Sequence, residues 1–547
     1  MFLYSHLVIL YSSFLAWYRG KASWLWQNMQ SYFAGIDAGT SGAAVIISDE
    51  RGRVVSSGFA DYSCIYGSEG RVEQDAAVLW AGVCEASRKA VAGLPGHPST
   101  VRSIAVASQR GTFLAVDRRW LPLMNSIVWA DRRAGVETEL LRARFGEARF
   151  HQVTGARLSE IWACSKVYWL VRNRSDVVER TWKFVNGQEW VLHNLGSESV
   201  FTDASAATMN GMMDMANKRW SAEVLSAIDI PEGLMPPLVS SMTGVGSVSP
   251  AASQATGFAR GTPLFVGGGD QQCAAVGAGI IRPGFAELAL GTGSVLITPV
   301  ESYVHDPRNT LLYGAHILPL LWDLEGISLS AGNCYRWWSQ TLAAGSHGAH
   351  RGSTGYEALD MEAESVRPGS EGLIFLPYFF GQFVPRYDSD MSGAFLGLRS
   401  SHGTKAMTRA VLEGISFEIR TIRDAMTSAI SQPLERIVLT GGGSKSREWT
   451  SILANVLGTP IARPVVSECT ALGAAILGAV GVGGFQSVDE AVASMVHVQN
   501  PIDPNPIVSS AYEDLYEVFV QATDALAANN LSRKLRDLAE KTTSGAS

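Results

Sequence analysis

The sequence predicts an α/β protein built from two related domains with a cleft between them. From Tyr32 onward, short apolar runs rich in β-branched residues alternate with longer amphipathic segments, as is typical of α/β folds. A strand, a tight glycine turn and a second strand occur at 33–47 and again at 286–298. Because each half of the chain opens with a similar hairpin, we expect two domains, with their boundary near 278–284.

Hydrophobic periodicity locates the individual elements. Strands are predicted at 32–36, 43–47, 101–107 and 112–116. Helices are predicted at 75–91, 133–145, 165–173, 406–428 and 509–538, and the last residues, 542–547, are expected to fray. The predicted organisation is an extension at 1–31, an N-terminal domain at 32–280, a C-terminal domain at 281–525 and a tail at 526–547.

Length and composition set the class of protein. At roughly 150 residues per domain, 547 residues fit three or four units or, equally well, two large ones. The formal net charge of -7 leaves no broad positive field, so we expect no nucleic-acid partner. The six cysteines show no metal-binding spacing, and we interpret them as buried thiols of a cytoplasmic protein.

The N-terminal segment is apolar. Residues 1–17 carry no charge and are followed by Arg19 and Lys21. This run is at the short end of the roughly 17 to 25 residues needed to span a bilayer, and no secretion cleavage site follows it. We interpret it as an extension upstream of the fold, with a membrane anchor as the alternative.

The first chemical motif is D-A-G-T-S-G at 37–42, directly after a predicted strand. Its glycines let the backbone approach phosphate oxygens, and the hydroxyls of Thr40 and Ser41 add donors. The carboxylate of Asp37 can hold hydrated magnesium. The alternative is a structural hairpin with an aspartate-initiated turn.

Two further glycine-rich turns follow strands. Gly267, Gly268 and Gly269 precede Asp270, whose carboxylate at a strand end can accept a proton from an attacking hydroxyl. Asp270 can also cap the next helix, and these readings are compatible. The second turn, G-G-G at 441–443, lets a flat ring or ribose lie against the backbone.

The order of these motifs resembles the FGGY family of carbohydrate kinases from about residue 33 to residue 484. The resemblance includes S-Q-R at 108–110, I-V-W-A-D-R-R at 127–133, the segment 377–398 and A-L-G-A-A at 471–475. It implies two actin-like, ribonuclease-H-like domains with ATP and Mg²⁺ in the cleft between them. We consider a homodimer as the assembly of this chain.

The resemblance also implies roles for individual residues. Asp270 matches the general base and Asp37 the magnesium position. Phosphate and nucleotide contacts are expected from Thr40, Ser41, Gly291, Thr292, Ser294, Gly442 and Gly443. Substrate contacts are expected from Gln109, Arg110, Gln271 and Asp270 itself.

Two positions depart from the family pattern. Ala44 stands where the first hairpin usually carries Lys or Arg, which removes a cation from the phosphates. Gly111 stands where glycerol kinases and autoinducer-2 kinases have a glutamate, and S-Q-R-G also differs from the Met-His pair of typical xylulose kinases. Ile161 and Trp162 are expected to form either a sugar-facing wall or part of the core.

A pentulose such as xylulose is the expected substrate. H-I-L-P at 316–319, S-A-G-N at 330–333 and R-W at 336–337 are similar to xylulose kinases. Autoinducer-2 or a glycerol-like polyol is the alternative substrate. Two alternatives propose a function other than a sugar kinase. One is a non-catalytic sugar-binding regulator, motivated by Ala44, and the other is an actin-like or chaperone-like ATPase.

Overall fold

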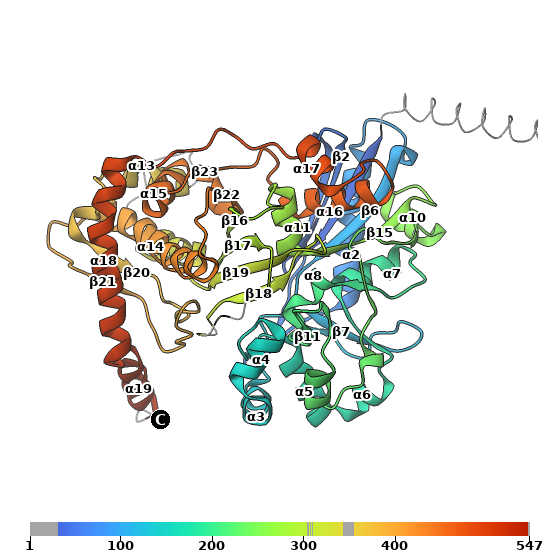
Figure 1. Ribbon diagram of the computed structural model, residues 1–547, viewed down its shortest axis with the longest axis horizontal. Helices are drawn as coiled ribbons and strands as arrows, with labels where there is room; N and C mark the ends of the chain where they lie inside the picture. Colours follow the sequence, from blue (N-terminus) through green and yellow to red (C-terminus); the bar gives the residue numbers. More distant parts are fainter. Residues whose placement is uncertain (1–30, 304–305, 307, 309, 343–354, 545–547) are drawn as a thin grey trace, which may run out of the picture.

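The computed structural model describes the whole chain except residues 1–30, 304–305, 307, 309, 343–354 and 545–547. Its two lobes are visible in Figure 1: one is mainly blue to green, with orange-red helices from late in the sequence packed on it, and the other is mainly yellow-green to red. The predicted extension at 1–31 lies, up to residue 30, outside the described residues. Within the described ranges, no helix combines the length and apolar character needed to cross a bilayer.

A six-stranded sheet forms the core of the first lobe. In spatial order its strands are β14 (Gly244–Ser247), β15 (Pro263–Gly269), β6 (Val101–Ser108), β1 (Tyr32–Ala38), β2 (Gly42–Asp49) and β3 (Val54–Asp61). β1 and β2 form the predicted antiparallel hairpin, and β1 pairs with β6 in parallel. The carboxyl ends of β1, β6 and β15 therefore meet at one edge of the sheet, where parallel α/β sheets bind ligands.

A second six-stranded sheet repeats this arrangement. Its strands, in spatial order, are β18 (Leu312–Ala315), β19 (Trp322–Ser328), β17 (Ser294–Val300), β16 (Phe285–Leu290), β22 (Arg436–Thr440) and β23 (Ile461–Ala462). β16 and β17 form the second predicted hairpin, and β16 pairs in parallel with β22, as β1 does with β6. The two lobes are thus built on one plan.

A smaller sheet and three short strand pairs complete the β-structure. The smaller sheet has the order β4 (Ile65–Tyr66), β5 (Val72–Gln74), β8 (Ser126–Ile127), β7 (Phe113–Val116) and β9 (Lys183–Asn186). The short pairs are β10 (Thr202–Asp203) with β13 (Leu238–Val239), β11 (Met213–Asp214) with β12 (Arg219–Trp220), and β20 (Ile374–Leu376) with β21 (Ala394–Leu396).

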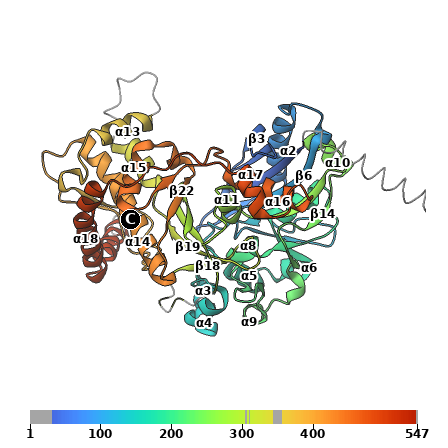
Figure 2. The ribbon, with the colours of Figure 1, turned by 45° about the horizontal axis from the view of Figure 1, so that its top comes forward.

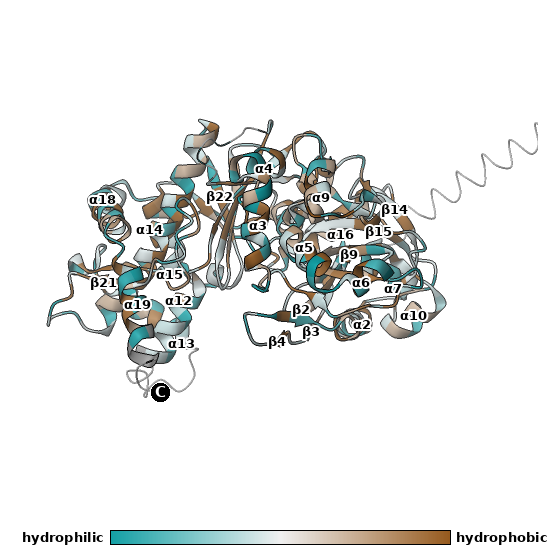
Figure 3. Ribbon diagram, turned by 90° about the horizontal axis from the view of Figure 1, so that it is seen from below, coloured by the Kyte–Doolittle hydropathy of each residue, from teal (hydrophilic) through white to brown (hydrophobic). Residues whose placement is uncertain are grey.

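Helices cover the sheets. Those before β16 are α2 (Ala76–Ala92), α3 (Gly135–Phe145), α4 (Glu147–Thr154), α5 (Ala163–Asn173), α6 (Ser175–Arg180), α7 (Gly187–Leu195), α8 (Ala204–Ala207), α9 (Ala222–Ala227), α10 (Pro250–Thr256) and α11 (Asp270–Gly277). Those after it are α12 (Gly332–Trp337), α13 (Gly355–Glu364), α14 (Thr404–Ile430), α15 (Arg447–Leu457), α16 (Cys469–Gly481), α17 (Val488–Met495), α18 (Pro506–Ala528) and α19 (Leu531–Ser544). In Figure 3, outer helices such as α18 carry both hydrophilic and hydrophobic residues, as helices with one buried face do.

Most expected elements are present, with small shifts at their ends. The helix predicted at 75–91 is α2, and the Asp75 side chain caps it by accepting from the N–H groups of Ala77 and Val78. The single helix predicted at 509–538 is wrong: α18 ends at Ala528 and α19 starts at Leu531. Asn530 between them has φ of 49°, a left-handed conformation that interrupts a helix.

The two halves of the sequence interlock. α16 and α17 follow the second sheet in the sequence, yet they pack on the first sheet, where α16 contacts β1 and β6. One buried cluster combines Phe33 and Ile46 of the first sheet with Leu472 and Val488 of these helices. A boundary drawn in the sequence near residue 280 therefore does not divide the hydrophobic core.

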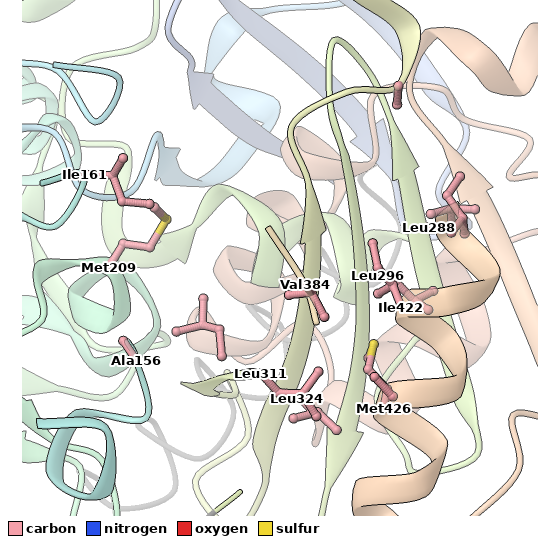
Figure 4. Close-up of a cluster of buried hydrophobic side chains, with 14 of the residues drawn as sticks. Ala156, Ile161, Met209, Leu288, Leu296, Leu311, Leu324, Val384, Ile422 and Met426 are labelled. Atoms are coloured by element: carbon pink, nitrogen blue, oxygen red, sulfur yellow. The ribbon is translucent and has the colours of Figure 1, made fainter. Parts of the chain in front are cut away.

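A second cluster joins the lobes on their other side. Figure 4 shows Ile161 and Met209 of the first lobe in the same buried cluster as Leu324 and Met426 of the second. Ile161 and Trp162, expected as a sugar wall or as core, are 4% and 1% exposed, so both belong to this core.

Glycines permit close packing of α11 against α16. A Cβ added at Gly473 of α16 would lie 1.9 Å from the Cys273 carbonyl oxygen of α11, and one at Gly277 would lie 2.0 Å from the Cys469 carbonyl oxygen. The helices lie side by side in Figures 1 and 2. Such distances exclude any side chain, so these glycines set where α11 lies.

We predict that Gly473→Ala destabilises the protein by about 2 kcal/mol or more, because overpacking forces α11 and α16 apart. Urea unfolding followed by circular dichroism measures the change. Gly135→Ala is the matched control, because a Cβ there has nothing within 4 Å. Equal stability of the two variants would contradict the packing argument.

Candidate active site

The turn of the first hairpin is held by side chains around Thr40. The Thr40 hydroxyl donates to Gln109 Oε1 (2.7 Å) and accepts from Trp129 Nε1 (3.1 Å). Gln74 Nε2 donates to the Thr40 carbonyl oxygen (3.1 Å), and Ser41 is exposed at the tip of the turn. The Thr40 hydroxyl thus has partners within the protein, whereas Ser41 faces solvent.

Gln109 connects this turn to the end of β6. Besides accepting from Thr40, it donates through Nε2 to Gln74 Oε1 (2.9 Å), and it is 1% exposed. Both ends of its amide therefore position the hairpin. Its contact with a substrate stays a prediction.

Asp270 is the first residue of α11 and follows β15. A Cβ at Gly267 would lie 2.1 Å from the Val106 carbonyl oxygen, and Gly267 has φ of +81°, so the strand end requires glycine there. Asp270 Oδ1 accepts from the N–H of Gln271 (2.8 Å) and from Arg110 Nε (3.2 Å). Within the described residues Oδ2 makes no hydrogen bond, and 27% of the side chain is exposed. One oxygen is fixed while the other is open to a ligand.

Arg110 joins the two lobes. Its Nη1 and Nη2 donate to Glu325 Oε1 (2.7 Å) and Oε2 (2.9 Å), while Nε donates to Asp270. The Arg110 and Glu325 side chains are 3% and 0% exposed. Gln272 Nε2 also donates to Glu325 Oε1 (3.0 Å). A bidentate, buried pair of this kind fixes the guanidinium plane.

Sequence reasoning missed Glu325. It lies on β19 of the second lobe, in W-D-L-E-G-I-S, where two acids interrupt an apolar strand. A buried acid in such a strand requires a partner, and this was the available signal. The partner, Arg110, is more than two hundred residues away in the sequence, so the pairing itself could not be read from it.

Burial shifts the pKa values of the carboxyl groups around the site. Burial raises the pKa of Asp270, while the Arg110 charge opposes that rise. Burial, and then the Asp270 charge, raise the pKa of Asp37 to about 7. Burial raises the pKa of Glu287 on β16 to about 8, and Thr440 donates to this carboxyl group (2.6 Å). Asp37 and Glu287 therefore carry protons at neutral pH part or most of the time.

His316 and Asp323 form a second buried pair in this region. His316 Nε2 lies 4.0 Å from Asp323 Oδ1, and both side chains are fully buried. Burial lowers the pKa of His316 to about 4 and raises that of Asp323 well above its ordinary value. His316 is thus uncharged near neutral pH, and burial favours the protonated form of Asp323.

Asp37 suits a hydrated cation. Within the described part of the chain its buried Oδ1 has no hydrogen-bond partner, and the Asp270 carboxylate is near enough to raise its pKa. Magnesium in kinases is commonly held by one or two carboxylates, with phosphate and water as the other ligands. A buried carboxylate oxygen without a proton donor fits that role.

A cavity of about 640 Å³ lies in the second lobe. It brings together the turn after β16, with Gly291 and Thr292, and the G-G-G turn, with Gly442 and Gly443. A Cβ at Gly442 would have nothing within 4 Å, so the backbone there faces open space. Sequence reasoning missed the other polar or aromatic side chains that line it, which are Tyr335, Arg336, Tyr356, Glu357, Asp360, Lys445, Ser446 and Trp449.

Three further positions named in the sequence analysis have different surroundings from one another. Ser294 is 2% exposed on β17 and does not line the cavity. Gln271 follows Asp270, and within the described residues its buried Oε1 has no partner, so it is available to a ligand hydroxyl. Gly111 has φ of +70°, a conformation that a glutamate would adopt only with strain.

Asp37→Asn should raise the melting temperature in magnesium-free buffer at about pH 8 by about 1–3 °C. A pKa raised from 3.8 to about 7 means that folding favours the protonated form, so the stability from this group is lost as the pH rises through that interval. Asparagine removes that penalty, and the benefit should be smaller at about pH 5. Calorimetric scans measure both values, and an equal shift at both would contradict the assignment.

Family models match most of the chain. The model described as FGGY family of carbohydrate kinases, N-terminal domain, matches residues 32–277, and the C-terminal domain model matches residues 286–482. The chain is 27% identical to xylulose kinase of Lactococcus lactis over 493 residues. This aligned region covers 90% of this chain and 96% of the relative. It is 27% identical over 512 residues to gluconokinase of Bacillus subtilis, with coverages of 93% and 97%.

A solved structure has the same fold. Xylulose kinase from Rhodospirillum rubrum superposes with a TM-score of 0.81 at 26% identity, covering 91% of this chain and 99% of that one. The chain belongs to the FGGY family of carbohydrate kinases and has the two-domain, actin-like and ribonuclease-H-like fold of that family.

Proposed function

We propose that the protein phosphorylates a hydroxyl of a pentulose such as xylulose, with ATP as the donor. The observation that carries this proposal is the geometry of Asp270. One oxygen is pinned by Arg110 and by its own helix, and the other has no partner within the described residues. A carboxylate held this way is suited to take a proton from a bound hydroxyl.

In the proposed step Asp270 accepts the hydroxyl proton as the sugar oxygen attacks the γ-phosphorus. A new P–O bond forms, the bond from the γ-phosphorus to the bridging oxygen breaks, and ADP leaves with that electron pair. The raised pKa of Asp270 makes it a stronger base than an exposed aspartate. Arg110 keeps the carboxylate in place.

Two parts of the chain would hold the nucleotide. The cavity lined by Gly291, Thr292, Gly442 and Gly443 would take the adenosine and phosphates, and Ser41 of the first hairpin would add a hydroxyl donor. Asp37 would hold Mg²⁺, which when bound neutralises phosphate charge. Backbone N–H groups and hydroxyls in both turns would then orient the γ-phosphoryl group.

A pentulose is favoured by the relatives. The Lactococcus lactis relative is named xylulose kinase, and the segments 316–319 and 330–333 resemble xylulose kinases. Gln271, with its free buried oxygen, would accept from a sugar hydroxyl. We also propose a cytoplasmic location, because all six cysteines are free thiols, the state that a reducing compartment maintains.

Asp270→Asn should lower kcat by about two orders of magnitude or more, because asparagine keeps the shape and the contact with Arg110 but cannot take a proton. A coupled assay of ADP release with xylulose measures kcat, and calorimetry should show sugar binding largely retained. Asp75→Asn is the control, since asparagine also caps helices well. Near-normal turnover by Asp270→Asn would refute the general-base role.

Ala44→Lys should lower KM for ATP. Ala44 lies directly opposite Asp37 in the β1–β2 register, so a lysine there would place a cation beside the phosphates. A charge-assisted contact worth about 1 kcal/mol corresponds to about fivefold.

Ala251→Lys, at an exposed position of α10, is the matched control for added charge. An unchanged KM for ATP would show that the hairpin does not contact phosphate. Absence of sugar-dependent turnover in every variant and in the native protein would instead favour the non-catalytic regulator.

A further inference from the structure

The surroundings of Asp270 are poor in positive charge. Within the described part of the chain, Arg110 is the only basic side chain that pairs with Asp270. The other groups that interact electrostatically with it are acidic or neutral. Across all packed elements these charged or titratable groups are Asp37, Arg110, Cys273, Glu287 and Glu325.

Arg110 does not offset this imbalance. It carries one positive charge against the two negative charges of Asp270 and Glu325, which leaves one negative charge even if Asp37, Glu287 and the neighbouring Asp323 are protonated. The Arg110 and Glu325 side chains are buried, so water screens their charges weakly. An anionic group entering beside them would be repelled.

Glu325 also occupies the face of Arg110 that binds carboxylates best. The two terminal nitrogens of a guanidinium form a fork that matches a carboxylate in two parallel hydrogen bonds. Glu325 fills that fork with bonds of 2.7 and 2.9 Å, and Gln272 holds it there. A substrate carboxylate would therefore have to displace a carboxylate that belongs to the protein.

We propose that Glu325 is a specificity-determining residue that restricts the site to uncharged sugars and polyols and rejects sugar acids. The inference rests on the proposed sugar kinase activity and narrows its substrate class. One relative, the gluconokinase of Bacillus subtilis, is named for a sugar acid, so the inference distinguishes the substrate class of this chain from the one in that name. Discrimination of this kind uses repulsion of the wrong ligand as well as attraction of the right one.

The first test compares D-xylulose with D-gluconate on the native protein. We expect kcat/KM for gluconate to be at least about a hundredfold lower, because like charges in a buried site are strongly unfavourable. Calorimetry of each ligand, without ATP, should show the same order of affinity. Gluconate binding as tightly as xylulose would overturn the inference. Loss of turnover with both ligands, with xylulose still bound more tightly, would overturn the proposed activity and support the inference.

The second test is Glu325→Gln. Glutamine keeps the size of the side chain but frees the charge of Arg110, so the ratio of kcat/KM for gluconate to that for xylulose should rise by about tenfold or more. The acid limb of the kcat/KM profile should also move to lower pH, because the Glu325 charge raises the pKa of Asp270. A folded variant with an unchanged ratio would overturn the proposal.

Glu413→Gln is the matched control. Glu413 is a buried carboxylate on α14 that accepts from Arg409 and Tyr512, outside the site. This variant should lose stability without changing the ratio or the pH profile, and a change equal to that of Glu325→Gln would overturn the specificity role. Where Glu325→Gln does not fold, gluconate binding to the native protein as tightly as xylulose would still overturn the proposal.

Discussion

The buried guanidinium of Arg110 is the interaction on which the arrangement of the site depends. A lone charge in the interior is strongly unfavourable, so Arg110 requires partners wherever it is placed. It finds Asp270 at the start of α11 and Glu325 on β19 of the other lobe. Removing one partner of a buried pair typically costs about 3–5 kcal/mol, which ties the relation of the two lobes to the orientation of the Asp270 carboxylate.

The close packing of α11 against α16 is the second constraint on the arrangement of the site. Gly473 and Gly277 allow α11 and α16 to approach until backbone meets backbone, and α16 also packs on β1, where a Cβ at Gly35 would lie 1.8 Å from the Ala471 carbonyl oxygen. α16 comes from the second half of the sequence. The helix that carries Asp270 is therefore wedged between elements of both halves, and its first residue is held more rigidly than a loop residue would be.

Local signals were enough to predict much of this structure. Hairpins, helix α2 and the strand before Asp270 follow from periodicity, caps and glycine turns, because those features act over a few residues. Contacts between residues far apart in the sequence could not be predicted. Nothing near Glu325 in the sequence indicates that it pairs with Arg110, and nothing in α16 indicates that it packs on the first sheet. From the sequence, Trp162 could not be assigned to a sugar-facing wall or to the hydrophobic core, because both environments favour an apolar aromatic side chain.

The distribution of charge suggests how the lobes divide the reaction. Acidic side chains gather around Asp270, and Ala44 leaves the first hairpin without a cation opposite Asp37. In the second lobe the cavity that we propose for the nucleotide is lined by Arg336 and Lys445 and also by Glu357 and Asp360. Positive charge for a polyphosphate would then come from Arg336, from Lys445 and from a magnesium ion, while the first lobe would supply the proposed base and hydrogen bonds.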